Sequence, residues 1–198
     1  MITIKGERLL GDLRVLRAMG AEGAGVVRPA FSDMDMVARH WLAERYSEAG
    51  LLAQIDGIGN VLGQSMNSGP RLLIGSHSDT QPTGGWLDGA LGVIYGLEVA
   101  RALAENEATK HSAIDAISWQ DEESRFYGCM GSRSFCGDFS SETEAGLTDK
   151  DGVALADALA LAGLTGIPRH LSSLVQEQPK VEHYFHIMPI GLHREDGG

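Results

Sequence analysis

Three side chains that could bind a metal ion lie close together in the segment Leu72–Gly92, LLIGSHSDTQPTGGWLDGALG. His77 offers an imidazole nitrogen, and Asp88 offers a carboxylate, both of which are ligands of first-row divalent metals. Asp79 follows His77 by two residues, so on an extended backbone the two side chains leave the same face. We therefore expect the Asp79 carboxylate to accept a hydrogen bond from the second ring nitrogen of His77 and to fix its tautomer. The two oxygens of Asp88 could bridge two cations.

A second group of acidic residues follows the apolar segment Ala113–Trp119, which continues as QDEE over residues 120–123. Adjacent glutamates can divide two roles, one binding a metal and the other accepting a proton from the attacking water. Each group also has a simpler interpretation, because HSD and Asp88-Gly89 are typical of polar turns and a glutamate pair is typical of a solvated surface. The occurrence of both groups, each after an apolar segment, favours a metal site.

The elements that must position these residues can be predicted from the hydrophobic pattern. Leu72–Ile74 and Ala113–Trp119 predict buried strands, and a helical pattern over residues 91–105 follows the first loop. Because ligands of α/β proteins bind beyond the carboxyl ends of parallel strands, the two loops are expected to meet at one edge of a sheet. Ser32 is expected to cap a helix whose residues Val37, Trp41 and Leu42 point inward. The other predicted elements are helices over 7–19, 32–49 and 148–163 (with Val153, Leu155, Leu159 and Leu161 facing the core), a helix starting at 131–135, and a hairpin of strands over 51–56 and 60–64.

Composition narrows the class of protein. The chain of 198 residues is long enough for one domain, with 43% hydrophobic and 22% charged residues, as in ordinary globular proteins. A net charge of −11 disfavours nucleic acid and anionic membranes as partners, and no apolar run is long enough for a membrane span. Cys129 and Cys136 form neither a disulfide framework nor a metal-binding pair. With no signal-peptide pattern at the start, a cytoplasmic location is expected.

Four motifs, GSHSDT, GGWLDGALGV, WQDEESRF and GSRSF, occur in this order. Their order and spacing resemble the di-metal amidohydrolases of the hydantoinase/carbamoylase group, which includes N-carbamoyl-L-amino-acid hydrolases, β-ureidopropionases and allantoate amidohydrolases. That group belongs to the wider clan of zinc aminoacylases and carboxypeptidases. The resemblance runs from about Leu9 to Leu164 and includes GVVRPAFSDMDMVARHWLAERYSEAGL and IDGIGNVLG. It implies an α/β fold, a three-layer sandwich with a mostly parallel central sheet, like the catalytic domain of zinc exopeptidases.

The resemblance also implies a set of metal ligands. The family binds two divalent ions, zinc or manganese, and the matching ligands here are His77, Asp88, Glu123 and His186, with Asp88 bridging. The assignment of His186 as a ligand depends on a short match. HI at residues 186–187 agrees with the family sequence FE-x-HIEQGP-x-LE, but the residues after it do not. His183 and His193 are alternative ligands that fit the run less well. His40 is expected to be a surface or packing histidine rather than a ligand.

Catalytic and substrate-binding roles follow from the same resemblance. Glu122 is expected to take the proton of the attacking water and return it to the leaving nitrogen, while Asp79 orients His77. Arg133 could contact a substrate carboxylate, since a guanidinium matches carboxylate geometry, but a surface helix arginine explains it equally well. Gln120 is expected to be a further substrate contact.

The family chain continues beyond the length of this one. Its lid and dimerisation domain and the C-terminal catalytic segment, which carries another metal-binding histidine, have no counterpart in residues 1–198. The chain is therefore expected to be the N-terminal part of the catalytic domain, truncated, with one ion or none bound and impaired activity. Strands left at sheet edges could pair with a second copy, which predicts a homodimer.

The expected activity is metal-dependent hydrolysis of the C–N bond of N-carbamoyl-L-amino acids or related ureido or amide acids. A small molecule of that class is the expected partner, with no nucleic acid and no membrane. Three alternatives remain: an aminoacylase or peptidase of the same clan, a catalytically inactive scaffold, and a module that pairs with a longer homologue.

Overall fold

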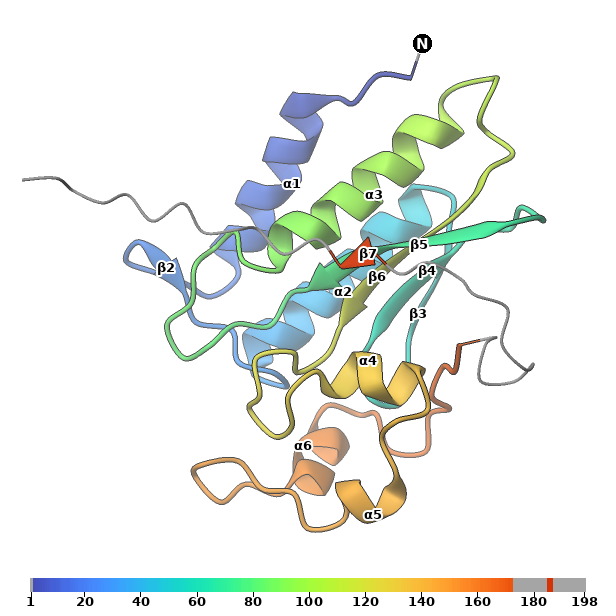
Figure 1. Cartoon of the computed structure of the whole chain (residues 1–198). Helices are drawn as coiled ribbons and strands as arrows, with labels where there is room; N and C mark the ends of the chain where they lie inside the picture. Colours follow the sequence, from blue (N-terminus) through green and yellow to red (C-terminus); the bar gives the residue numbers. More distant parts are fainter. Residues whose placement is uncertain (1, 173–184, 187–198) are drawn as a thin grey trace, which may run out of the picture.

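The computed structural model describes residues 2–172 and 185–186 and has an α/β fold (Figure 1). None of the helices in these residues is long and apolar enough to cross a membrane. The elements, in chain order, are α1 (Gly6–Ala18), β1 (Ala21–Glu22), β2 (Gly25–Val26), α2 (Asp33–Glu48), β3 (Leu52–Ile55), β4 (Val61–Gln64), β5 (Arg71–His77), α3 (Ala90–Ala104), β6 (Ala113–Trp119), α4 (Met130–Phe135), α5 (Ser141–Glu144), α6 (Leu155–Leu161) and β7 (Phe185–His186).

The central sheet is mixed, with the strand order β3-β4-β6-β5-β7. β5 runs parallel to β6 and to the two-residue β7. The hairpin of β3 and β4 is antiparallel, and β4 is also antiparallel to β6. The prediction of a mostly parallel sheet is therefore correct only for the β6-β5-β7 part. The short connection between β3 and β4 reverses the chain, and this places an antiparallel strand beside β6.

Helices cover the two faces of the sheet unequally among the described residues. α1, α2 and α3 share one apolar core with β4 and β6, and Leu16, Leu42, Ile94 and Leu97 are fully buried there. On the other face, α4 contributes Phe135 to a smaller cluster, whose buried members are Leu62, Ile117, Trp119 and Phe135. Adjacent residues such as Ala116 and Ile117 belong to opposite clusters because side chains alternate along a strand. The sheet thus lies between a thick helical layer and a thin one.

The two strands that precede the candidate loops end together. β5 and β6 pair in parallel from Arg71↔Ala113 to His77↔Trp119, so the loops that follow them start at the same edge of the sheet. The loop after β6 is anchored by Phe126 and Met130, which are buried in a further apolar cluster with Phe31, Leu155 and other residues. This arrangement confirms the expectation that the two candidate groups meet.

α2 confirms the predicted N-cap, since the Ser32 hydroxyl accepts the main-chain N–H of Asp35 at 3.2 Å. The predicted inward face is only partly correct. Leu42 is buried, but Val37 is 47% exposed. The buried stripe instead contains Asp35, Ala38, Arg39, Leu42 and Tyr46, and its two charged residues shift the inward face away from the one that apolar residues alone would predict.

The helix predicted over residues 148–163 is shorter, because α6 covers only Leu155–Leu161. The Asp149 carboxylate accepts the main-chain N–H groups of Asp151 and Val153, both at 2.9 Å, which closes a turn where the helix was expected to begin. Of the four residues predicted to face the core, Leu155 and Leu159 are buried, whereas Val153 and Leu161 are exposed.

Candidate metal centre

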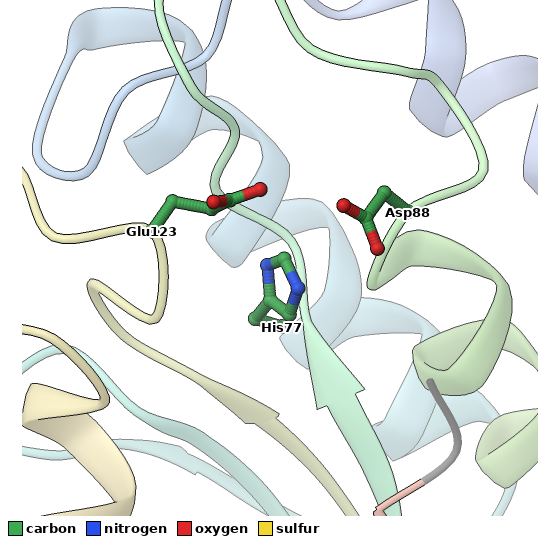
Figure 2. A group of neighbouring side chains, drawn as sticks. All are labelled: His77, Asp88 and Glu123. Atoms are coloured by element: carbon green, nitrogen blue, oxygen red, sulfur yellow. The ribbon is translucent and has the colours of Figure 1, made fainter. Parts of the chain in front are cut away.

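His77, Asp88 and Glu123 meet at the edge of the sheet where β5 and β6 end (Figure 2). His77 is the last residue of β5, Asp88 precedes α3, and Glu123 lies in the loop after β6. One ligand atom from each side chain lies within 4.8 Å of the other two. One imidazole and two carboxylates fit a divalent ion such as zinc or manganese. The structure thus brings together three of the four predicted ligands, and these three residues form the metal group.

Gly89 allows the loop of Asp88 to pass directly over the imidazole. Its backbone has φ 62° and ψ −53°, a conformation that residues with a Cβ rarely adopt. A Cβ at this position would lie 2.5 Å from both Cε1 and Nε2 of the His77 ring. The approach of Asp88 to His77 therefore depends on a glycine between Asp88 and α3.

The tautomer of His77 is set by a main-chain group. Its Nδ1 lies 3.0 Å from the carbonyl oxygen of Asp79, whereas the Asp79 carboxylate is 3.8 Å away. The prediction that the carboxylate holds the ring therefore names the right residue but the wrong group. A carbonyl can only accept a hydrogen bond, so Nδ1 carries the proton and Nε2 keeps its lone pair for an ion.

The buried carboxylate of Asp79 holds the second loop instead. One oxygen, Oδ2, accepts the main-chain N–H of Glu123 at 3.2 Å. The other, Oδ1, lies 3.6 Å from Nη2 of Arg39. Burial raises the pKa of the Asp79 carboxyl above its usual range, while the charges of His77 and Arg39 oppose that shift. Asp79 is thus in contact with two of the three residues of the metal group.

Glu122 lies beside the metal group with its side chain 21% exposed, and its Oε2 is 3.5 Å from Nε2 of His77. Its Oε1 lies 3.8 Å from the thiol of Cys129, and burial together with this carboxylate raises the pKa of the thiol. The neighbouring Glu123 accepts a hydrogen bond from the side-chain amide of Gln81 at 2.9 Å. The two glutamates therefore face the same site from one loop, as adjacent residues with separate roles would require.

An open cleft of about 640 Å³ adjoins the metal group on the side of Glu123. A cleft of this size can hold a small organic ligand. Its lining combines polar and apolar side chains, among them Gln81, Glu123, Val27, Phe31, Pro82 and Leu161.

Gln120 is not available as a substrate contact. Its side chain is fully buried, and its amide nitrogen donates to Asp35 at 3.1 Å. A Cβ on Gly59 would lie only 2.7 Å from that nitrogen, so the turn between β3 and β4 packs directly on the amide. The prediction for Gln120 is wrong because the residue after β6 points into the interior rather than toward the cleft.

Arg133 lies on α4 with contacts of its own. Its guanidinium pairs with Asp138 at 2.8 Å, and its side chain is 39% exposed. It also lies over the ring of Tyr127, 5.0 Å from the centroid. These contacts agree with the alternative of a surface arginine, and the role in substrate binding stays a prediction.

His186 lies in β7, and its main chain pairs with Gly75 of β5, two residues before His77. Its backbone is thus beside the strand that carries His77, while its side chain lies outside the described part of the chain. The alternative ligands His183 and His193 also lie outside the described residues. His40 is exposed on α2, as expected.

Two groups of buried contacts beside the site were not predicted from the sequence. Asp35 and Arg39 form a buried ion pair at 3.0 Å, and the only signal for it was their i, i+4 spacing on a helix. The carboxylate of Asp121 accepts three main-chain N–H groups of the following loop, those of residues 125–127. It fixes the backbone that carries Glu122 and Glu123, but in the sequence it was only one member of an acidic run.

Comparison with known proteins defines the class of protein to which the chain belongs. Residues 58–165, which include the whole metal group, match the family model described as Peptidase family M28. The chain is 34% identical to the N-carbamoyl-L-amino acid amidohydrolase of Geobacillus stearothermophilus over 98% of its own length and 47% of that protein. It is 31% identical to the ureidoglycolate hydrolase of Oryza sativa subsp. japonica, over 87% of this chain and 36% of that protein.

The fold agrees with that of a crystal structure of an amidase from Burkholderia phymatum, described as of the hydantoinase/carbamoylase family. The two share 55% sequence identity with a TM-score of 0.86, over 88% of this chain and 43% of the amidase. The chain belongs to the hydantoinase/carbamoylase family of amidohydrolases, which is related to the M28 peptidases. It spans less than half the length of these relatives.

Proposed function

We propose that this chain forms a metal-binding part of the catalytic domain of a hydrolase acting on the C–N bond of N-carbamoyl-L-amino acids or related ureido or amide acids. The observation that carries the proposal is the convergence of His77, Asp88 and Glu123 within 4.8 Å, with Glu122 beside them. The substrate class is supported by the activities that the names of the relatives state, N-carbamoyl-L-amino acid amidohydrolase and ureidoglycolate hydrolase.

The donor set fits a divalent ion, with zinc and manganese as the proposed metals. His77 would supply Nε2, and Asp88 and Glu123 would supply carboxylate oxygens, with His186 as a proposed further ligand. A bound ion would lower the pKa of a water molecule and polarise the substrate carbonyl. Because a catalytic zinc ion usually has three protein ligands and a water, this set is sufficient for one ion. A second ion shared through Asp88 would lack ligands among these residues.

One residue beside a bound ion would supply the proton transfers. Glu122 would accept the proton of the attacking water and donate it to the nitrogen that leaves when the C–N bond breaks. Its carboxylate suits this role because it is partly exposed and lies 3.5 Å from Nε2 of His77, so a water near the ion is within its reach. Asp79 would keep His77 in one tautomer through its carbonyl. The cleft beside Glu123 gives the rest of the substrate a place to bind.

Metal stoichiometry of the purified 198-residue chain tests the proposal. After zinc or manganese is added and loose ions are removed, we expect one retained ion, which is lost in His77→Ala. His40→Ala is the matched control, since it removes an exposed histidine of α2 and should leave the ion in place. If the unmodified chain retains no ion, the proposal is wrong.

Hydrolysis of N-carbamoyl-L-amino acids by the metal-loaded chain tests the chemistry. Glu122→Gln should keep the ion and lower kcat by about 10²-fold or more, the usual contribution of a general base. A variant that keeps both the ion and most of its turnover would show that Glu122 is not the base.

A further inference from the structure

Arg39 is a fully buried arginine that joins three parts of the molecule beneath the metal group. Its side chain is 0% exposed, and its Nε donates to the Asp35 carboxylate at 3.0 Å. It also donates to the main-chain carbonyl of Gly59 at 3.0 Å and of Trp119, the last residue of β6, at 3.1 Å. The rigid fork of a guanidinium can satisfy several acceptors at once, which a lysine cannot do. Arg39 thus ties α2 to the turn between β3 and β4 and to the end of β6.

The same guanidinium faces the carboxylate of Asp79. Nη2 of Arg39 lies 3.6 Å from Oδ1 of Asp79, an oxygen that is buried and makes no hydrogen bond within the described residues. The other atoms of Asp79 hold the metal group, because its carbonyl oxygen contacts Nδ1 of His77 and its Oδ2 accepts the N–H of Glu123. A continuous series of contacts therefore runs from Arg39 through Asp79 to two of the three ligands.

A second buried arginine shows that burial alone does not produce these contacts. Arg28 is 1% exposed, but within residues 2–172 its side chain donates to main-chain carbonyls alone, those of Ser78, Leu16 and Met19. Within the described residues, Arg39 is the arginine whose guanidinium lies within 4 Å of the Asp79 carboxylate. Burying a charged guanidinium is costly unless it is paired and hydrogen-bonded, and here Asp35 and Asp79 supply the opposite charges.

We propose that Arg39 is a positioning residue of the metal centre, which holds Asp79, and through it His77 and Glu123, in the arrangement that binds the ion. The proposal rests on the proposed function, since it requires that the group binds metal. It makes a specific claim: the loss of Arg39 should weaken metal binding by a route that passes through Asp79, and not through a general loss of stability.

The test is the zinc affinity of the 198-residue chain, measured by competition with a chelating dye, together with the urea midpoint of each metal-free variant. Arg39→Gln should weaken zinc binding by about 10- to 100-fold, the usual effect of removing a group that orients a ligand. Arg39→Lys keeps the positive charge without the forked guanidinium, and it should weaken zinc binding less than Arg39→Gln does. Leu42→Ala, three residues along the same helix and buried in the apolar core, is the control for lost stability and should keep the zinc affinity.

The route is tested by combining Arg39→Gln with Asp79→Asn. If Arg39 acts through Asp79, the double variant should bind zinc within about threefold of Asp79→Asn alone, because coupled residues are not additive. Fully additive losses would overturn the proposal, as would Arg39 variants that keep the affinity of the unmodified chain. Should Arg39→Gln fail to fold, the same comparison of single and double variants is made with Arg39→Lys. A chain that binds no zinc at all overturns the proposed function, and the role of Arg39 with it, whereas zinc binding that is insensitive to Arg39 overturns only this inference.

Discussion

Replacing Gly89 by alanine would place a methyl group against the imidazole of His77. The new Cβ would lie 2.5 Å from Cε1 and Nε2 of the ring and 2.5 Å from the carbonyl oxygen of His77, well inside van der Waals contact. The residue also has a positive φ of 62°, which is unfavourable for any residue with a Cβ. The substitution therefore combines backbone strain with an overlap at the centre of the candidate site.

The expected magnitude follows from these two effects. A strained φ/ψ pair costs about 1–3 kcal/mol, and relieving an overlap in a packed region costs about 1–3 kcal/mol. We therefore expect Gly89→Ala to lower the free energy of unfolding by about 2–6 kcal/mol in urea denaturation without metal. Because relief requires the loop of Asp88 to move away from His77, the variant should also bind zinc more weakly.

Gly85→Ala is the matched control. Gly85 lies in the same loop, has no positive φ, and has no heavy atom within 4 Å of an added Cβ. Its substitution should change the free energy of unfolding by no more than about 0.5 kcal/mol and leave zinc affinity unchanged. If Gly89→Ala behaves like Gly85→Ala in both measurements, the close contact between Gly89 and His77 is refuted.

Three further predictions concern other parts of the chain. Asp121→Ala leaves three main-chain N–H groups without their acceptor and should lower the free energy of unfolding by about 2–4 kcal/mol; a smaller loss in urea denaturation would mean that water replaces the carboxylate. Ser32→Ala removes the hydroxyl that accepts the N–H of Asp35 and should cost about 1 kcal/mol in the same assay; no change would show that the cap contributes nothing. The side chain of Arg8 holds the pKa of Glu105 at about 2, below its ordinary value of 4.5. A carboxyl whose pKa is lower in the folded state stabilises the fold above its unfolded pKa, and that stability is lost as the pH falls from about 4.5 to 2. Arg8→Met should return the pKa of Glu105 toward its ordinary value in an NMR titration, and an unchanged pKa would contradict the assigned cause.

The strands that position the site were predictable because their signal is local. Ala113–Trp119 is apolar except for Asp115 and Ser118, and the structure gives β6 the same bounds. The inward face of α2 was not predictable in this way, because the rule that charged residues face solvent assigns Asp35 and Arg39 to the wrong side. Their partners, among them Asp79 and the carbonyl of Trp119, lie far away in the sequence and only the fold brings them close.

Contacts between residues that are distant in sequence also explain which site predictions needed correction. His77 ends β5, Asp88 lies just before α3, and Glu123 lies in the loop after β6, so the predicted topology was sufficient to bring them together. The carbonyl of Asp79, rather than its carboxylate, makes the contact with Nδ1 of His77, because β5 ends at His77 and the regular geometry of a strand no longer places the following residues. Gln120 was expected to be a substrate contact from its place in a family motif, whereas the tight packing of Gly59 on its amide depends on a hairpin distant in sequence.

The metal group draws its residues from three separate segments, the end of β5, the loop before α3 and the loop after β6. An ion bound there would act as a cross-link between segments that lie apart in the sequence. Closing such loops with a metal removes chain entropy from the less ordered states, and binding to the folded form alone raises stability in proportion to the logarithm of ion concentration. Ion occupancy would then protect the backbone on either side of Asp88 and Glu123 against proteolytic cleavage, making these loops reporters of the loaded state.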